Sequence, residues 1–153
     1  MSKRLWLCVP LISIGLVGCA VAPGAPTTKL LEAPVGCNPG ICFVDIWISD
    51  CDRPGGIQAE PYKLEVPDRG KVKNIRWRIR NEGYIFRSDG IVITSPDGEF
   101  DEPEMSANGQ MFKWRDKHSA GKLPYDFKYS VNVVKTGDTP RNCYKYDPYI
   151  SNQ

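Results

Sequence analysis

Apolar and polar residues alternate along several short stretches of the chain. The apolar face of residues 125–133 carries Tyr125, Phe127, Tyr129, Val131 and Val133. Residues 62–66 repeat this alternation, and in residues 75–80 the apolar positions alternate with arginines. A period of two predicts β strands that have one buried face and one exposed face.

Residues 41–49 are apolar at almost every position, with Asp45 as the exception. Such a run predicts a strand that is covered on both faces. Shorter apolar stretches at 84–86, 91–94 and 111–114 complete a set of about seven strands, separated by Gly, Pro, Asp or Asn. No stretch of this region has a helical period. The pattern predicts an all-β fold, an antiparallel β-sandwich of the immunoglobulin-like or cupredoxin-like type.

The first residues have the organisation of a secretion signal. Lys3 and Arg4 give a positive start, and residues 5–17 are almost entirely apolar. This run is shorter than the roughly 20 residues that a membrane-spanning helix needs, and small residues follow it. We therefore predict export of the chain rather than a retained transmembrane helix.

At the end of this segment, Leu16-Val17-Gly18-Cys19 resembles the lipobox of bacterial lipoproteins. The resemblance implies that the Cys19 thiol receives a diacylglycerol, that the signal peptide 1–18 is removed, and that the new amino terminus is acylated. Several acyl chains on one residue hold a domain stably on a membrane, whereas a single chain does not. The alternative is ordinary secretory cleavage near Ala20 or Ala22, which discards Cys19.

The residue after Cys19 predicts the membrane on which the mature chain is located, and the charge balance predicts which partners it does not bind. In enterobacterial members of the family an aspartate at this position retains the protein at the inner membrane, so Ala20 implies the outer membrane, on its periplasmic face. Cleavage removes Lys3 and Arg4 from the 20 basic residues and leaves all 18 acidic residues, so the mature protein is neutral overall. A neutral exported chain is not expected to bind nucleic acid.

The mature chain divides into a tether and one domain. Residues 19–36 are rich in proline and have no amphipathic period, which predicts an extended linker behind the lipidated cysteine. Residues 37–153 are long enough for one domain with a hydrophobic core and too short for two.

Four cysteines remain in this domain, and an oxidising compartment favours their pairing into two disulfides. A strand between residues 42 and 51 holds its ends about 30 Å apart, whereas bridged Cα atoms lie within about 7 Å of each other. Cys42 therefore cannot reach Cys51, and Cys37, which precedes Cys42 closely, cannot fold back far enough either. The remaining pairs are Cys37 with Cys42 and Cys51 with Cys143.

His118 is the only histidine, and its polar surroundings between two strands predict a solvated side chain. Blue-copper sites use two histidines and a cysteine, so the histidine count excludes them. The cysteine spacing is not that of a zinc site, and a catalytic triad would have to use His118 beside Ser119 without a recognisable nucleophile turn. We therefore expect no cofactor, no metal and no enzymatic activity.

The run 97–104 is strongly acidic and contains no base. Its acidic residues are Asp97, Glu99, Asp101, Glu102 and Glu104. The sequence predicts a solvated loop, with a Ca²⁺ site or contact with a partner as alternatives, although the run lacks the order of an EF-hand loop. A glycoside hydrolase would also need such carboxylates, and that hypothesis predicts abnormal titration of Glu99, Glu102 or Glu104.

The strongest predicted surface feature is a row of arginines. Alternation in residues 75–80 places Arg76, Arg78 and Arg80 on the face opposite the apolar side chains, and further bases precede them at Arg69, Lys71 and Lys73. One interpretation is a solvated strand face, balanced by acids on neighbouring strands, or a charged edge strand that discourages aggregation. The other is a docking stripe for an anionic partner, because arginine pairs bidentately with phosphate and carboxylate groups.

Together these patterns predict a lipid-anchored module that binds or supports an envelope component or a protein. The anions available there are lipopolysaccharide phosphates, the peptide stems of the cell wall and acidic protein surfaces, and Arg76, Arg78 and Arg80 are the predicted binding residues. The alternative is an immunity or inhibitor lipoprotein that neutralises a periplasmic toxin or hydrolase through the acidic run 97–104. The run and the arginine row also have the opposite charges needed to meet within one molecule.

Overall fold

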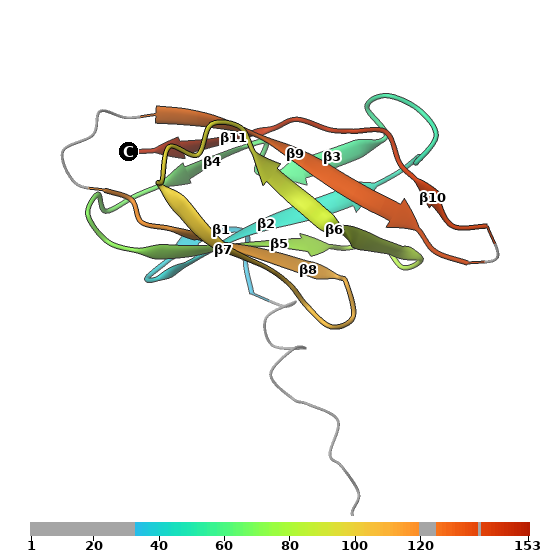
Figure 1. Cartoon of the computed structure of the whole chain (residues 1–153), viewed down its shortest axis with the longest axis horizontal. Coiled ribbons are helices and arrows are strands. Elements are labelled where there is room, and N and C mark those ends of the chain that lie inside the picture. Colours follow the sequence, from blue (N-terminus) through green and yellow to red (C-terminus); the bar gives the residue numbers. More distant parts are fainter. Residues whose placement is uncertain (1–32, 120–124, 138) are drawn as a thin grey trace, which may run out of the picture.

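The computed structural model describes residues 33–119, 125–137 and 139–153, and the regular elements in them are β strands. Figure 1 shows these strands in two layers. In chain order they are β1 (Gly36–Asn38), β2 (Ile41–Ile48), β3 (Ile57–Glu60), β4 (Lys63–Val66), β5 (Lys73–Ile79), β6 (Tyr84–Ile93), β7 (Phe100–Met105), β8 (Met111–Asp116), β9 (Tyr125–Lys135), β10 (Arg141–Asn142) and β11 (Tyr149–Asn152). The predicted all-β sandwich with two disulfides is confirmed.

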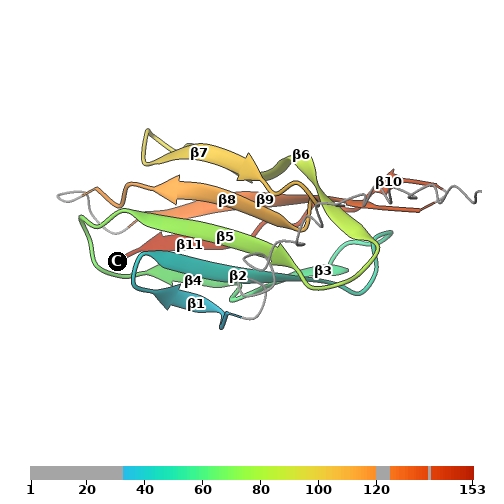
Figure 2. The same cartoon turned by 90° about the horizontal axis from the view of Figure 1, so that it is seen from below.

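The first sheet has the strand order β1-β2-β5-β8-β7, and β3 also pairs with β2. Figure 2 shows the five strands of this path in the same order. β1 and β3 share one edge of β2, because β1 pairs with residues 41–43 and β3 with residues 45–48. β5 pairs with residues 41–46 along the other edge. Strand β2 is therefore enclosed on both edges, and most of its apolar run is buried as predicted.

The second sheet is built around β9, in the order β10-β9-β11-β4, with β6 also paired to β9. β6 pairs with residues 129–135 along one edge of β9. The other edge pairs with β11 through residues 125–128 and with β10 through residues 134–135. The C-terminal strand β11 therefore lies inside the second sheet, between β9 and β4.

Two strand pairs are parallel, which differs from the predicted antiparallel sheets. β2 pairs with β5, and β4 pairs with β11, in the parallel sense. After β2 the chain turns back as β3, crosses to the second sheet as β4 and returns beside β2 as β5, so β2 and β5 run in the same direction. Both sheets are mixed, and in this they differ from the antiparallel sheets of the immunoglobulin fold.

Two further stretches differ from the expectation in detail. The apolar segments at 84–86 and 91–94 belong to one strand, β6, whose register shifts between Phe86 and Ile91. Gly90 lies in this irregularity, where a Cβ would come 2.7 Å from the Cβ of Phe86 and 2.9 Å from the ring of Phe112. The acidic run, predicted as a loop, forms most of strand β7, because it pairs with β8.

The hydrophobic core lies between the two sheets and contains three edge-to-face aromatic pairs. Trp77 of β5 packs against Tyr129 of β9, with ring centroids 5.3 Å apart. The other two pairs are Phe86 with Phe112 and Phe100 with Phe127. The alternation identified the core face of β5 correctly, because Ile75, Trp77 and Ile79 are all buried. On β9, the core face consists of Phe127, Tyr129, Val131 and Val133, all of them buried.

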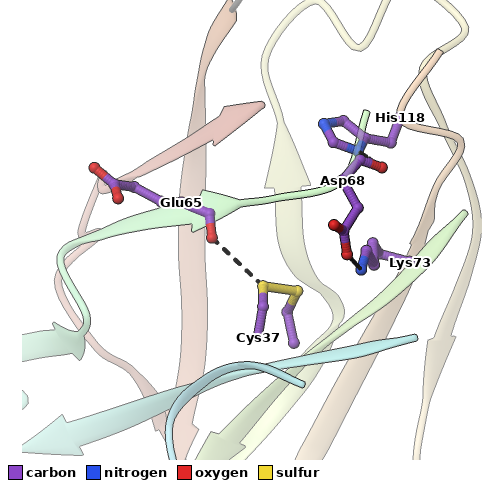
Figure 3. Close-up of a disulfide and its surroundings, with 6 residues drawn as sticks. Cys37, Glu65, Asp68, Lys73 and His118 are labelled. Atoms are coloured by element: carbon purple, nitrogen blue, oxygen red, sulfur yellow. Dashed lines mark hydrogen bonds and ion pairs between the residues drawn. A yellow bond between two sulfur atoms is a disulfide. The ribbon is translucent and has the colours of Figure 1, made fainter. Parts of the chain in front are cut away.

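Both predicted disulfides are present. Cys37 is bonded to Cys42 across the β1–β2 hairpin, and Cys51 is bonded to Cys143 over a sequence separation of 92 residues. The sulfur of Cys37 also lies 3.5 Å from the carbonyl oxygen of Glu65 in β4, so the Cys37–Cys42 disulfide contacts the second sheet (Figure 3). The strand between Cys42 and Cys51 excludes the other pairings, as predicted.

The predicted signal peptide 1–18, the lipidation site Cys19 and residues 20–32 of the predicted tether lie outside the described residues. The tether's described end, at Ala33, is held by Arg78 of β5, whose Nη1 donates to the Ala33 carbonyl oxygen at 2.5 Å. Within the described ranges, no helix has the length and apolar character needed to cross a membrane.

Candidate functional site

Arg78, the middle residue of the predicted arginine row, is buried rather than exposed. Only 1% of its surface is accessible, because three groups on the outer face of the first sheet enclose the guanidinium. Its Nε donates to Asp45 Oδ1 of β2 at 2.6 Å, and its Cζ lies 4.6 Å from the ring centroid of Phe43. The carbonyl of Ala33 receives a further hydrogen bond. The prediction that Arg78 lies on an exposed face is therefore wrong, and its guanidinium is held by groups of the domain itself.

Arg80 lies at the end of the row and already has partners in the domain. Its Nε is 3.6 Å from Asp45 Oδ2, and its Cζ is 5.9 Å from the ring centroid of Trp47. Asp45 is the polar exception in the apolar run of β2. It forms ion pairs with both Arg78 and Arg80 on the outer face of the sheet. Trp47 remains 43% exposed beside them.

Arg76 differs from the other two arginines because it is half-buried without a matching acid. Among the described residues, its buried Nε has no hydrogen-bond partner, and no carboxylate lies within 4 Å of its guanidinium. On the neighbouring strand β8, Lys113 stands directly opposite Arg76 in the register. The Nζ of Lys113 is already paired with Glu104 Oε2 at 2.6 Å.

Arg76 borders a pocket of about 110 Å³ on the outer face of the first sheet. Its lining residues are Arg76, Glu104, Ser106, Met111, Phe112 and Lys113. The Ser106 hydroxyl donates to Asn108 Oδ1 at 2.7 Å and accepts the backbone N–H of Met111 at 3.0 Å, which fixes the turn at the pocket rim. The pocket therefore combines an arginine without a paired acid, one neutralised ion pair, a hydroxyl and the apolar side chain of Met111.

Three carboxylates of the acidic run form ion pairs with bases of the adjacent strand β8. Asp101 accepts hydrogen bonds from Nε and Nη2 of Arg115 at 2.7 and 2.8 Å, and Glu102 lies 2.8 Å from Arg115 Nη1. The Arg115 hydrogen bond lowers the pKa of Asp101 to about 2, and Lys113 lowers that of Glu104. In residues 33–119, 125–137 and 139–153, no three His, Cys, Asp or Glu side chains are grouped to hold a metal ion.

A buried polar cluster lies at one end of the sandwich, where β8 ends beside β11. Asp116 is fully buried and His118 is 1% exposed, so the expectation of a solvated histidine is wrong. Asp116 Oδ1 accepts the backbone N–H of His118 at 2.8 Å and the amide of Asn152 at 3.3 Å. The His118 ring contacts the carbonyl oxygen of Asp68 through Nδ1 at 3.1 Å, and Asp68 pairs with buried Lys73 (Figure 3).

Burial raises the pKa of Asp116 to about 6, and the nearby carboxylate of Glu99 adds to this rise. Glu99 itself is buried and accepts the backbone N–H of Ser119. These side chains are closed to solvent and present no surface to a substrate, so the cluster acts as a link between β8, β11 and the chain around Asp68. It supplies no exposed acid for the hydrolase hypothesis.

The cluster predicts a pH-dependent stability difference for Asp116→Asn. The folded-state pKa of Asp116 is about 6, above its ordinary value of 3.8, so the ionised carboxylate destabilises the fold above pH 6. This cost is relieved as the pH falls from 6 to 4. We expect the variant to be about 1 to 3 kcal/mol more stable than the wild type at pH 7.5.

Urea unfolding between pH 4 and pH 7.5 measures this difference, which should disappear near pH 4. Lower stability of the variant at every pH would contradict the prediction, because it would mean that the fold requires the negative charge.

Comparison of the chain with known protein families and with curated proteins gives no match.

Proposed function

We propose that the chain is a lipoprotein, anchored through Cys19 to the outer membrane, with its sandwich domain on the periplasmic face. The support is the lipobox-like sequence at residues 16–19 after a secretion signal. The two disulfides are in keeping with an oxidising compartment.

The anchor predicts that Cys19→Ala abolishes lipid attachment. Cells that express the wild-type chain should incorporate labelled palmitate into it, and the variant should remain unlabelled as an uncleaved precursor. Label of equal intensity in the variant would show that Cys19 is not the acylated residue.

The proposed activity of the domain is binding of an anionic envelope component or protein partner at the Arg76 pocket. The observation that carries this proposal is the half-buried guanidinium of Arg76, which borders a pocket and has no acid partner in the described part of the chain. A positive charge that is partly removed from water is costly unless it is paired, and a bound anion supplies the pair. The carboxylates of Asp101, Glu102 and Glu104 in the acidic run are paired with bases of β8, so the contacts favour an anionic partner over a basic toxin.

Replacement of Arg76 by alanine is expected to weaken binding to the partner. The mature chain in detergent micelles would be passed over isolated cell-wall sacculi, immobilised lipopolysaccharide and envelope protein extract at low and high salt. We expect one fraction to retain the wild type, less strongly at high salt, and Arg76→Ala to lose about tenfold or more in affinity.

The matched control is Arg87→Ala, which removes the same charge from an exposed pair with Asp89 on β6 in the second sheet. It should bind like the wild type. Equal retention of wild type and Arg76→Ala would overturn the proposal.

A further inference from the structure

The charges that line the Arg76 pocket sum to a single positive charge. Lys113 and Glu104 form an ion pair at 2.6 Å and compensate each other. Arg76 is the remaining charged residue of the lining, so one negative charge on a ligand would neutralise the pocket. Glu104 also lies close enough to Arg76 for the arginine to contribute to its lowered pKa.

The geometry points to the terminal carboxylate of a peptide as the group that this pocket binds. We propose this on the basis of the proposed function, because both assign Arg76 as the docking residue. A carboxylate carries one negative charge, and its planar shape matches the donors of a guanidinium. A phosphate monoester would bring about two negative charges next to the Glu104 carboxylate, and one of them would be left without a partner.

The size and the lining of the pocket favour a small residue at the end of the peptide. A pocket of about 110 Å³ has room for a carboxylate with a small side chain. The Met111 side chain provides apolar contact for a methyl group, which suits a terminal alanine. The backbone of such a peptide would leave the pocket over the exposed edge formed by β7.

A terminal alanine carboxylate has two sources in the bacterial envelope, the peptide stems of the cell wall and the C termini of proteins. The two sources differ in the chirality of the alanine. The proposal is therefore tested with small probes of both kinds, N-acetyl-D-alanyl-D-alanine and N-acetyl-L-alanyl-L-alanine, together with their C-terminal amides and with inorganic phosphate.

Methionine methyl signals report binding within the mature chain itself, purified in detergent micelles and labelled at the methionine methyl carbons. Met111 lines the pocket, and Met105 on β7 lies outside its lining and serves as an internal reference. We expect the free-acid dipeptides to shift the Met111 signal with a Kd in the millimolar range. The amides and Arg76→Ala should each weaken binding at least tenfold, and Arg76→Lys should fall between, because lysine keeps the charge and loses the bidentate contact.

Preference for the D,D probe would assign the cell-wall peptides, and preference for the L,L probe would assign protein C termini. Equal affinity for an acid and its amide, or a phosphate response as strong as that of the dipeptides, would overturn the inference. In either of those cases, loss of envelope retention in Arg76→Ala would leave the proposed function intact. Unchanged retention in Arg76→Ala would overturn the proposed function instead.

Discussion

Replacing both Cys51 and Cys143 by alanine is expected to lower the free energy of unfolding by about 4 to 5 kcal/mol. This disulfide closes a segment with a sequence separation of 92 residues, and the loss of loop-closure entropy in the unfolded chain grows with loop length. It joins the turn after β2 to the chain beyond β10. Nearby hydrogen bonds, such as that from the Tyr144 N–H to the Cys51 carbonyl at 3.1 Å, depend on the same junction.

The control for this prediction is the other disulfide, between Cys37 and Cys42. It closes a separation of 5 residues, for which the same relation gives only about 2 kcal/mol. Urea unfolding of the two double-alanine variants under non-reducing conditions compares them directly. If the short-loop variant lost as much stability as the long-loop variant, loop closure would not be the source of the effect.

The second large effect is expected for Asp45→Ala, which removes the carboxylate that is paired with the buried Arg78 guanidinium. Removing one partner of a buried ion pair typically costs about 3 to 5 kcal/mol, because an uncompensated charge remains inside the protein. Arg78 cannot move into water, since Phe43 and the chain at Ala33 enclose it. The free energy of unfolding from urea titration should therefore fall by this amount.

An exposed pair provides the comparison for Asp45→Ala. Lys63 and Asp126 are 2.9 Å apart, with side chains 43% and 52% exposed, so Asp126→Ala should cost no more than about 1 kcal/mol. A double variant, Asp45→Leu with Arg78→Met, should recover most of the lost stability, because it removes both charges together. A loss for Asp45→Ala as small as that for Asp126→Ala would contradict the buried-pair interpretation.

The strands and both disulfides could be predicted because they depend on local pattern and chain length. Alternation alone placed Trp77 in the core, and the extended length of β2 alone excluded a bond between Cys42 and Cys51. The parallel pairing of β2 with β5 could not be predicted in this way, because it depends on which sheet β4 joins, and the alternation of β4 is the same in either sheet.

The burial of Arg78 is a second case in which the local pattern was insufficient. Alternation correctly placed Arg78 on the outer face of β5. That face is covered there by Phe43, Asp45 and the end of the tether at Ala33, which are distant in sequence. The apolar run of residues 41–49 indicated a strand covered on both faces, and Asp45 within it was the available signal for a buried cationic partner.

The buried cluster was missed although alternation contained a signal for it. In β8, Phe112 points into the core. Asp116 follows it by an even number of positions, so its carboxylate lies on the same face of the strand and also points inward. The same holds in β11, where Ile150 and Asn152 are both buried. If polar residues are included in the alternation of inward and outward positions, Asp116 and Asn152 fall on the inward face of their strands. Their contact with each other, and with His118, required the sheet register.

Site-specific crosslinking in intact cells tests most directly whether the domain binds an envelope partner at the Arg76 pocket. A photoreactive amino acid would replace Ser106 at the pocket rim in the full-length chain, or, as a control, exposed Lys145 between β10 and β11. We predict an adduct with a cell-wall fragment or one envelope protein from position 106, lost when Arg76→Ala is added, and no such adduct from position 145. The same adduct from both positions, or its survival in Arg76→Ala, would contradict the account.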